Sequence, residues 1–360
     1  MAGPRTIPGT PESVLAALAS VLSGSTGAFV PVPDDPALLD RVLAAARPDE
    51  PLERECAVVL PTSGSTGEPK AVLLTAQALR ASAAATHARL GGPGQWLLAM
   101  PSYFIGGLQV LTRSLLAGTA PIVVDGNFSE AARWMTGDRR YTAIVPTQLR
   151  RLLATSVGAL RSFDAVLVGA AAAPPGLLAD ARAAGVRVVT TYGMTETGGG
   201  CVYDGVPLDG VTAEVVDGRI VLGGRTLFSG YRLRPDLTAQ VLVDGRFLTQ
   251  DCGRLEDGRL EVLGRLDDVV ISGGVNVALP AVRDRVLAHP SVTDAAVLGL
   301  PDPEWGTRVV AYIVGPVALD DLRDFVAAEL PRTWAPREVV VLEALPMLAS
   351  GKVDRQALLG

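Results

Sequence analysis

The sequence predicts an α/β protein with a large N-terminal domain of mixed or parallel sheets and a small α+β domain at its C-terminus. Short apolar runs alternate with helical patterns from Cys56 to about Thr191, which is typical of parallel strands joined by crossover helices. Glycine-punctuated hairpin patterns follow, and beyond Gly264 the pattern changes once more. We therefore expect domains at residues 1–264 and 268–360, connected through residues 265–267.

In the first region, each apolar run has the length of a buried strand. Thr75 is a suitable N-cap for an Ala-rich helix that continues to Leu90, and Pro174 and Pro175 fit the first turn of a later helix. The strand-like runs of this region are AVVL, AVLL, WLLAM, PIVVD, TAIVP, AVLVG and VRVVTT.

The two later regions have different signals. The segments VVDGRIVLGG and LEDGRLEVLG place Asp-Gly between apolar runs, which is a strong signal for a tight antiparallel turn. Nearer the C-terminus, a helix is expected from Leu319 to Leu330, and the strand-like segments are VTDAAVLGL, RVVAYIV and REVVVL. An antiparallel β region followed by a small α+β domain is the result.

Composition excludes several classes of protein. The chain has 360 residues and a formal charge of -6, and no basic block stands out, so nucleic acid is a poor candidate partner. Its three cysteines form no CxxC pair, as expected in a reducing compartment, and two histidines offer few ligands for zinc. No signal peptide and no apolar run of about 20 residues is evident, so we expect a cytoplasmic protein without a membrane span.

The segment TSGSTGEPK, from Thr62 to Lys70, is the richest in chemistry. Its small residues offer hydroxyl and backbone N–H groups that could surround phosphate oxygens, and Lys70 adds a positive charge. Ala71 follows Lys70 where a Walker A loop has Ser or Thr, so ordinary P-loop chemistry is disfavoured. A flexible Ser/Gly turn is the competing interpretation of this segment alone.

Five further segments follow in one order along the chain. They are VGAAAAP from Val168, TYGMTE from Thr191, TQD from Thr249, GRLDD from Gly264 and ASGKVDR from Ala349. With this ordered set the chain resembles the adenylate-forming superfamily of acyl-CoA synthetases, luciferases and peptide-synthetase adenylation domains. The resemblance runs from about Cys56 to the C-terminus. It implies an enzyme that activates a carboxylic acid with ATP and Mg²⁺ and passes the acyl group to coenzyme A.

The resemblance also implies roles for individual residues of an N-terminal ATP- and acid-binding domain. Tyr192 would pack on adenine, Thr195 would hydrogen-bond the α-phosphate and Glu196 would help to hold magnesium. Thr195 and Glu196 count among the catalytic residues. The implied ATP-binding residues are Thr62, Ser63, Gly64, Ser65, Thr66, Gly67, Lys70, Ala171, Ala172, Tyr192, Gly193, Met194, Asp251 and Arg265.

The resemblance implies that the small α+β domain is a mobile catalytic lid. In this domain, Lys352 matches the family lysine that bridges the acid and the α-phosphate. A fixed ammonium there would offset the repulsion between the attacking carboxylate and the phosphate. Asp267 occupies the hinge position, and Gly273 and Gly274 the place of the CoA tunnel. A solvated lysine and ordinary turn residues are the structural alternatives for these positions.

Within the superfamily, the chain resembles the subfamily that activates 2-succinylbenzoate in menaquinone biosynthesis. The matching segments are GGLQVLTRSLLAG from Gly106, VPTQLRRLL from Val145 and CVYDGVPLDGV from Cys201. The resemblance implies acid-binding residues Phe104, Gly107 and Arg113. Arg113 would hold the carboxylate that does not react, directly or through water, and an arginine extending from the helix edge to solvent is the alternative.

Other functions stay open at this point. Tyr103 and Phe104 stand where the subfamily often has His, which leaves room for a different aromatic acid. A carrier protein could replace CoA as the acceptor, and a nucleotide-binding regulator without catalysis is a second alternative. The expected partners are a small carboxylic acid, ATP and CoA, and a homodimer is one assembly that the sequence leaves open.

Overall fold

A computed structural model describes the protein at residues 2–24, 27–62, 70–348 and 353–359. The chain forms two compact units. The first comprises Met1–Glu214, Val221–Leu248 and Gly258–Leu260, and the second comprises Val215–Ile220, Thr249–Asp257 and Glu261–Gly360. A hinge at residues 265–267 stays a prediction, because compactness alone does not identify a hinge.

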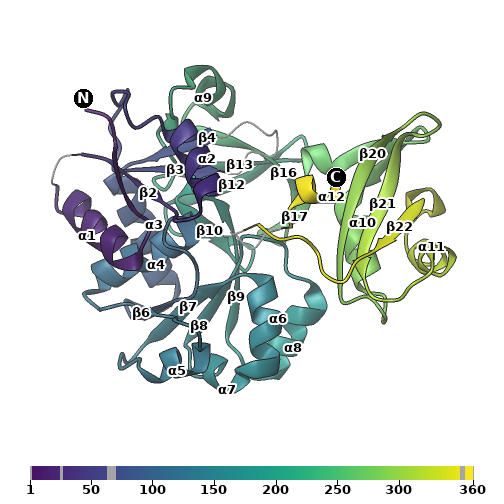
Figure 1. Cartoon of the computed structure of the whole chain (residues 1–360), viewed down its shortest axis with the longest axis horizontal. Coiled ribbons are helices and arrows are strands. Elements are labelled where there is room, and N and C mark those ends of the chain that lie inside the picture. Colours follow the sequence, from purple (N-terminus) through teal and green to yellow (C-terminus); the bar gives the residue numbers. More distant parts are fainter. Residues whose placement is uncertain (1, 25–26, 63–69, 349–352, 360) are drawn as a thin grey trace. The chain divides into compact units, whose positions relative to one another are not determined.

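The first unit begins with a five-stranded sheet in the order β1-β2-β3-β4-β14 (Figure 1). β1 and β3 run parallel to β2, whereas β4 is antiparallel to both of its neighbours, β3 and β14. The helices α1 (Pro11–Leu22) and α2 (Pro36–Ala46) connect its early strands. The strands are β1 (Arg5–Pro8), β2 (Phe29–Val32), β3 (Val58–Thr62), β4 (Lys70–Leu74) and β14 (Gly230–Tyr231).

The antiparallel pairing of β3 with β4 corrects one expectation. The runs AVVL and AVLL are strands as predicted, but they form a hairpin and no crossover helix separates them. Thr62 lies opposite Lys70 in this ladder, so residues 63–69 connect two strand ends that are already side by side. The segment predicted to bind phosphate therefore connects the two strands of a β-hairpin.

The second sheet has seven strands in the order β11-β10-β9-β8-β7-β5-β6. β9, β8, β7, β5 and β6 are parallel, which confirms the predicted crossover region, and β10 pairs antiparallel with β9 and β11. The strands are β5 (Gln95–Leu98), β6 (Ile122–Val123), β7 (Arg140–Ile144), β8 (Ala165–Val168), β9 (Val188–Met194), β10 (Gly199–Tyr203) and β11 (Val206–Pro207).

Helices connect the parallel strands and cover them. α4 packs against β5 and β7, and α8 packs against β9. Figure 1 shows α3 and α4 above these strands and α6 and α8 on their other side. The helices are α3 (Ala76–Arg89), α4 (Ile105–Ala117), α5 (Phe128–Arg133), α6 (Pro146–Thr155), α7 (Val157–Leu160) and α8 (Pro175–Ala183). The predicted N-cap is confirmed, since Thr75 Oγ1 accepts a hydrogen bond from the Ala78 N–H (3.1 Å).

Arg232 ties distant parts of the first unit together. Its side chain is fully buried, and it forms an ion pair with Glu53. The guanidinium also donates hydrogen bonds of 2.6–3.0 Å to four backbone carbonyls between α2 and β3, those of Ala46, Arg47, Glu50 and Pro51. Buried charge is stable only when it is paired and hydrogen-bonded, and this arginine satisfies both conditions.

A third sheet has the order β12-β13-β16-β15, with β17 paired to β16. Asp217 and Gly218, and likewise Asp257 and Gly258, all have positive φ, as a type I′ hairpin turn requires, so both predicted hairpins are confirmed. The elements of this region are β12 (Val211–Val216), β13 (Arg219–Gly224), α9 (Pro235–Val241), β15 (Leu242–Val243), β16 (Arg246–Glu256) and β17 (Arg259–Arg265).

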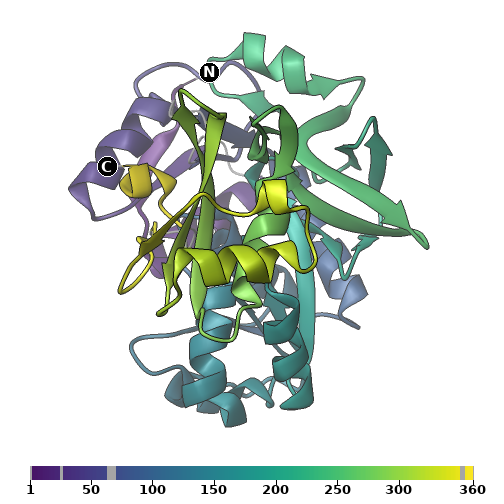
Figure 2. The same cartoon turned by 90° about the vertical axis from the view of Figure 1, so that its right-hand side faces the viewer.

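The C-terminal part of the second unit contains a β18-β19 hairpin and a three-stranded sheet, β20-β21-β22. In Figure 2 this sheet and α11, in green to yellow, face the viewer. α11 ends at Ala327, three residues before the expected Leu330. The elements are β18 (Val269–Ser272), β19 (Val275–Ala278), α10 (Leu279–Leu287), β20 (Asp294–Asp302), β21 (Gly306–Val314), α11 (Leu319–Ala327), β22 (Glu338–Val341) and α12 (Arg355–Leu359), with short 3-10 turns at Leu266–Asp268 and Arg332–Trp334.

Candidate active site

The phosphate segment is described only at its two ends. Thr62 closes β3, Lys70 opens β4, and both are half-buried. The Lys70 ammonium lies 5.5 Å from the centre of the Tyr231 ring, a distance at which a cation is attracted to an aromatic face. Ser63, Gly64, Ser65, Thr66 and Gly67 lie outside the described residues, so their contact with phosphate stays a prediction.

Glu196 lies in a tight 3-10 turn, Thr195–Thr197, directly after β9. Thr197 Oγ1 accepts from the Met194 N–H (2.9 Å) and lies 2.7 Å from the Gly199 carbonyl, which fixes the turn from within. A Cβ atom at Gly193 would lie 2.2 Å from that same carbonyl oxygen, so only glycine fits there. The close packing presents Thr195 and Glu196 in one conformation.

One segment anchors Glu196 at both its backbone and its side chain. The Phe228 N–H donates to the Glu196 carbonyl (2.8 Å), and the Tyr231 hydroxyl donates to Glu196 Oε1 (2.8 Å). Burial, followed by the charge of Glu196, raises the pKa of Tyr231, so its hydroxyl keeps its proton and acts as the donor. Sequence reasoning missed Tyr231, because the two residues are 35 positions apart.

The adenine-binding candidates meet at the carboxyl ends of two parallel strands. Ala171 and Ala172 follow β8 and are exposed, and Tyr192 lies near the end of β9. A Cβ atom at Gly169 would come within 2.1 Å of Thr191 Oγ1, so the backbones approach closely there. Ligands of open α/β sheets bind at this edge, which suits a nucleotide base.

The acid-binding candidates belong to α4 and to the residue before it. Phe104 is the N-cap residue, and its ring lies 4.7 Å from that of Tyr103. Gly107 has no room for a side chain, because a Cβ atom would lie 2.2 Å from the Pro101 carbonyl oxygen. Arg113 is only 3% exposed, so the alternative of an arginine that extends into solvent is wrong.

Arg113 is buried among uncharged groups. Its guanidinium carbon lies 4.9 Å from the Trp96 ring, and Nη2 donates a long hydrogen bond to the Tyr203 hydroxyl (3.4 Å). Burial lowers the pKa of Arg113, and burial together with the Arg113 charge lowers the pKa of the neighbouring His87 to about 4. The site therefore holds a desolvated positive charge.

Two buried polar atoms on successive turns of α4 lack a hydrogen-bond partner in the described part of the chain. They are Gln109 Oε1 and Arg113 Nε. Residues four apart on a helix lie on the same face, so the Gln109 acceptor and the Arg113 donor belong to one buried face of α4. Such atoms are costly to bury unless a ligand or a water molecule satisfies them. Gln109 was not predicted, since one glutamine in an apolar helix gives no local signal.

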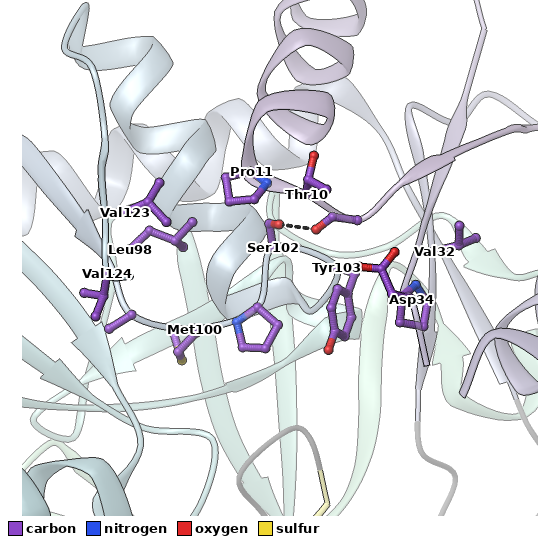
Figure 3. A pocket seen from close by; sticks show the side chains of 14 residues that line it. Thr10, Pro11, Val32, Asp34, Leu98, Met100, Ser102, Tyr103, Val123 and Val124 are labelled. Carbon is purple, nitrogen blue, oxygen red and sulfur yellow. Dashed lines mark hydrogen bonds between the residues drawn. The ribbon is translucent and has the colours of Figure 1, made fainter. Parts of the chain in front are cut away.

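A cavity of about 430 Å³ lies beside Tyr103 (Figure 3). Thr10, Met100 and Ser102 also line it, and Asp34 is its charged residue. Burial, followed by the charges of Asp35 and Asp34, raises the pKa of Tyr103. The exposed carboxylate of Asp34 gives the wall of this cavity a negative charge, whereas Arg113 on α4 is positive.

The remaining candidates lie in the second unit. Asp251 is on β16, where its N–H donates to Thr249 Oγ1 (3.0 Å), and Arg265 ends β17. Gly273 and Gly274 form the β18-β19 turn, with φ of 58° and 79°. Asp267 lies in the 3-10 turn that follows β17. Their placement around a nucleotide or CoA stays a prediction.

Lys352 lies outside the described residues, but its flanks are fixed. Val353 forms an antiparallel bridge with Met347, so the two ends of this connection meet. Three residues beyond Lys352, Arg355 holds both carboxylate oxygens of the buried Asp268, at 2.6 and 3.0 Å. A two-point pair of this kind fixes orientation as well as distance.

The chain matches two family descriptions in the expected order. Residues 12–232 match the family described as "AMP-binding enzyme", and residues 284–352 match "AMP-binding enzyme C-terminal domain". The chain therefore belongs to the AMP-binding enzyme family.

Relatives within that family make the class more specific. A Mycobacterium tuberculosis protein named "Probable 2-succinylbenzoate--CoA ligase" is 47% identical, over 96% of this chain and 94% of its own length. Among solved structures, the Bacillus subtilis o-succinylbenzoate CoA synthetase, in complex with its acyl-adenylate intermediate, is 28% identical with a TM-score of 0.76, over 98% of this chain and 82% of that one. That synthetase has also been solved with ATP and a magnesium ion.

A further solved structure, an ATP-bound RpMatB-BxBclM chimera, has a TM-score of 0.86 at 25% identity and covers 99% of this chain and 88% of that one. Together these similarities identify an AMP-forming acid–CoA ligase.

Proposed function

We propose that this enzyme converts 2-succinylbenzoate, ATP and CoA into 2-succinylbenzoyl-CoA, AMP and pyrophosphate, as a step of menaquinone biosynthesis. The observation that carries the choice of acid is the buried Nε of Arg113, which has no hydrogen-bond partner among the described residues and lies one helical turn from Gln109. A substrate with a second carboxylate supplies the negative charge that this part of α4 lacks. The names of the Mycobacterium and Bacillus relatives support the same substrate.

In the first half-reaction, a carboxylate oxygen attacks the α-phosphate of ATP and pyrophosphate leaves. The segment from Thr62 to Lys70 holds the β- and γ-phosphates, Thr195 holds the α-phosphate, and Lys352 offsets the charge that builds up between the two anions. Tyr192 and the turn of Ala171 and Ala172 hold the adenine. Asp251 and Arg265 hold the ribose.

The described residues suit a magnesium ion that is bound together with the phosphates of ATP. They contain no cluster of three His, Cys, Asp or Glu side chains that could hold a metal by itself. Magnesium is usually held by one or two carboxylates together with substrate phosphates and water, and Glu196 would supply one such carboxylate. When bound, the ion neutralises charge on the transferring phosphate. Orienting the carboxylate is the contribution of this chain.

In the second half-reaction, the CoA thiol attacks the acyl carbonyl and AMP leaves. We infer that the C-terminal domain turns about Asp267 between the two steps, which withdraws Lys352 and brings Gly273 and Gly274 to the acyl group. Glycine at these positions places no side chain in the passage proposed for pantetheine.

A location in the cytoplasm and a homodimer remain predictions. No helix among the described residues is long and apolar enough to cross a bilayer.

An acid panel tests the proposal. The enzyme is incubated with ATP, CoA and one of 2-succinylbenzoate, benzoate, a monocarboxylate analogue that lacks the ring carboxylate, or an aliphatic acid, and AMP and thioester are measured. We expect the highest catalytic efficiency with 2-succinylbenzoate. A clear preference for another aromatic acid would overturn the substrate and point to Tyr103 and Phe104 as the cause. Transfer to a carrier protein but not to CoA would contradict the acceptor.

A further inference from the structure

Tyr231 stands between two residues assigned to the triphosphate end of ATP. Its hydroxyl donates to Glu196 Oε1 at 2.8 Å, and the Lys70 ammonium lies 5.5 Å from the centre of its ring. These three residues come from β14, from the turn after β9 and from the start of β4. In the β4-β14 ladder Tyr231 pairs with Val72, two positions beyond Lys70. The pairing of the two strands therefore brings Tyr231 close to Lys70.

The tyrosine is held rigidly. It is 7% exposed, and its ring lies edge-on to Phe228 with the centres 5.0 Å apart. Its backbone N–H donates to Thr238 Oγ1 (2.9 Å). The same segment fixes the backbone of Glu196 through the Phe228 N–H. A hydrogen-bond donor that does not move can hold a flexible carboxylate in one rotamer, which removes the entropic cost of ordering it during binding.

We propose that Tyr231 is a positioning residue for the divalent cation that accompanies ATP, acting by orienting the carboxylate of Glu196. The hydroxyl donates to Oε1 and restricts the rotation of the carboxylate, which would orient Glu196 for the cation. The ring attracts Lys70, which places the ammonium at the same end of the nucleotide. The inference rests on the proposed role of Glu196.

Tyr231→Phe removes only the hydroxyl and keeps the ring over which Lys70 lies. Mn²⁺ binding to the full-length enzyme with ATP, and without any acid, is titrated by the electron paramagnetic resonance signal of free Mn²⁺. A hydrogen bond to a charged group typically corresponds to about a ten- to hundred-fold change in affinity, so we expect weaker Mn²⁺ binding of roughly this size. Metal-free ATP should bind as tightly as it does to the wild type.

Tyr141→Phe is the matched control. Tyr141 is also buried, and its hydroxyl contacts the Leu90 and Gly92 carbonyls (3.0 and 3.1 Å) away from Glu196. This variant reports the loss of a buried hydroxyl alone, and we expect unchanged Mn²⁺ affinity. Urea unfolding of both variants confirms that they fold. Equal loss of Mn²⁺ affinity in the two would overturn the inference.

Glu196→Gln separates this inference from the role on which it rests. If Tyr231 acts through Glu196, the double variant should bind Mn²⁺ no more weakly than Glu196→Gln alone, whereas independent roles would give additive losses. If Glu196→Gln binds Mn²⁺ more weakly and Tyr231→Phe binds it normally, the inference about Tyr231 is wrong and the role of Glu196 stands. Normal Mn²⁺ binding by Glu196→Gln overturns both. The acid panel, which depends on neither variant, decides the proposed function separately.

Discussion

At the scale of single residues, Arg113 is a buried charge whose place in the fold does not favour stability. A guanidinium buried without a carboxylate partner destabilises a fold, and the stacking on Trp96 and the hydrogen bond to Tyr203 offset this only in part. Structural arginines in the same protein look different: Arg232 has an acid and four carbonyls around it. Of these two buried arginines, Arg113, whose Nε has no hydrogen-bond partner among the described residues, is therefore the better candidate for binding a ligand.

Arg113→Leu tests this reasoning with two measurements. Hydrogen bonds to charged groups contribute about 1.5–3 kcal/mol each, so catalytic efficiency with 2-succinylbenzoate should fall roughly ten- to over a hundred-fold. The catalytic efficiency with a monocarboxylate analogue that lacks the ring carboxylate should be almost unchanged. The free energy of unfolding should not decrease, since the variant no longer buries an unpaired charge. Equal losses for both acids, or a clearly less stable variant, would assign Arg113 to the fold.

Lys352→Ala should lose acyl-adenylate formation by orders of magnitude yet still convert a supplied acyl-adenylate and CoA into thioester. The reason is that the ammonium is needed only when two anions approach each other. The measurements are pyrophosphate exchange and thioester formation, with Lys352→Arg as a variant that keeps the charge. Near-normal exchange by the alanine variant would refute the role.

At the scale of elements, turn chemistry decided which predictions succeeded. Both predicted Asp-Gly hairpins formed, because a type I′ turn depends on two neighbouring residues alone. The same device recurs at Asp204–Gly205 and Asp244–Gly245, which also have positive φ. In contrast, the pairing of β3 with β4 depends on how a chain segment reverses, and alternating apolar runs do not contain that information.

The β18-β19 turn offers a prediction about CoA. Gly274→Leu should leave adenylation largely intact and reduce thioester formation, because a bulky side chain would enter the proposed passage for pantetheine. A Cβ atom at this position meets no atom within 4 Å, so the fold has space for it, but its φ of 79° is unfavourable for leucine. Gly274→Asn is the control, since asparagine tolerates this conformation. Equal loss of both half-reactions would indicate misfolding or a different passage.

At the scale of the whole molecule, the sequence predicted the fold well and the contacts within the site only in part. Strands, helices and their order follow from local periodicity, and the ordered motifs indicated the chemistry. The contact of Tyr231 with Glu196 spans 35 positions and that of Arg113 with Tyr203 spans 90, so both depend on the completed fold. The burial of Arg113 is a consequence of tertiary packing that helix periodicity alone left open.

The free energy of unfolding of the whole protein should depend on pH through His87. The Trp96 indole N–H donates to His87 Nε2 (3.3 Å), which requires a neutral ring, and the pKa of His87 is lowered to about 4. Between about pH 6.5 and 4 the unfolded chain binds a proton that the folded chain does not, so stability falls as the pH falls through this window. The expected contribution is at most about 1.4 kcal/mol per pH unit.

Urea unfolding of wild type and His87→Gln between pH 7.5 and 4.5 measures this contribution. The variant should lose less stability on acidification than the wild type. His289→Gln, which removes the protein's other histidine, serves as the comparison and should behave like the wild type. An identical pH dependence for wild type and His87→Gln would contradict a neutral His87 in the fold.

The contacts of Arg232 indicate whether the first part of the chain can be removed without affecting the rest. The sequence motifs begin only near Cys56, which invites the view that the preceding residues are an optional extension. Yet the partners of Arg232 all lie between Ala46 and Glu53. A shortened chain that started at Cys56 would keep the recognised motifs. It would also remove the partners of Arg232, and so leave a fully buried positive charge unpaired next to the strand that carries Tyr231. Removing the early segment should therefore also disturb the segment that carries Tyr231.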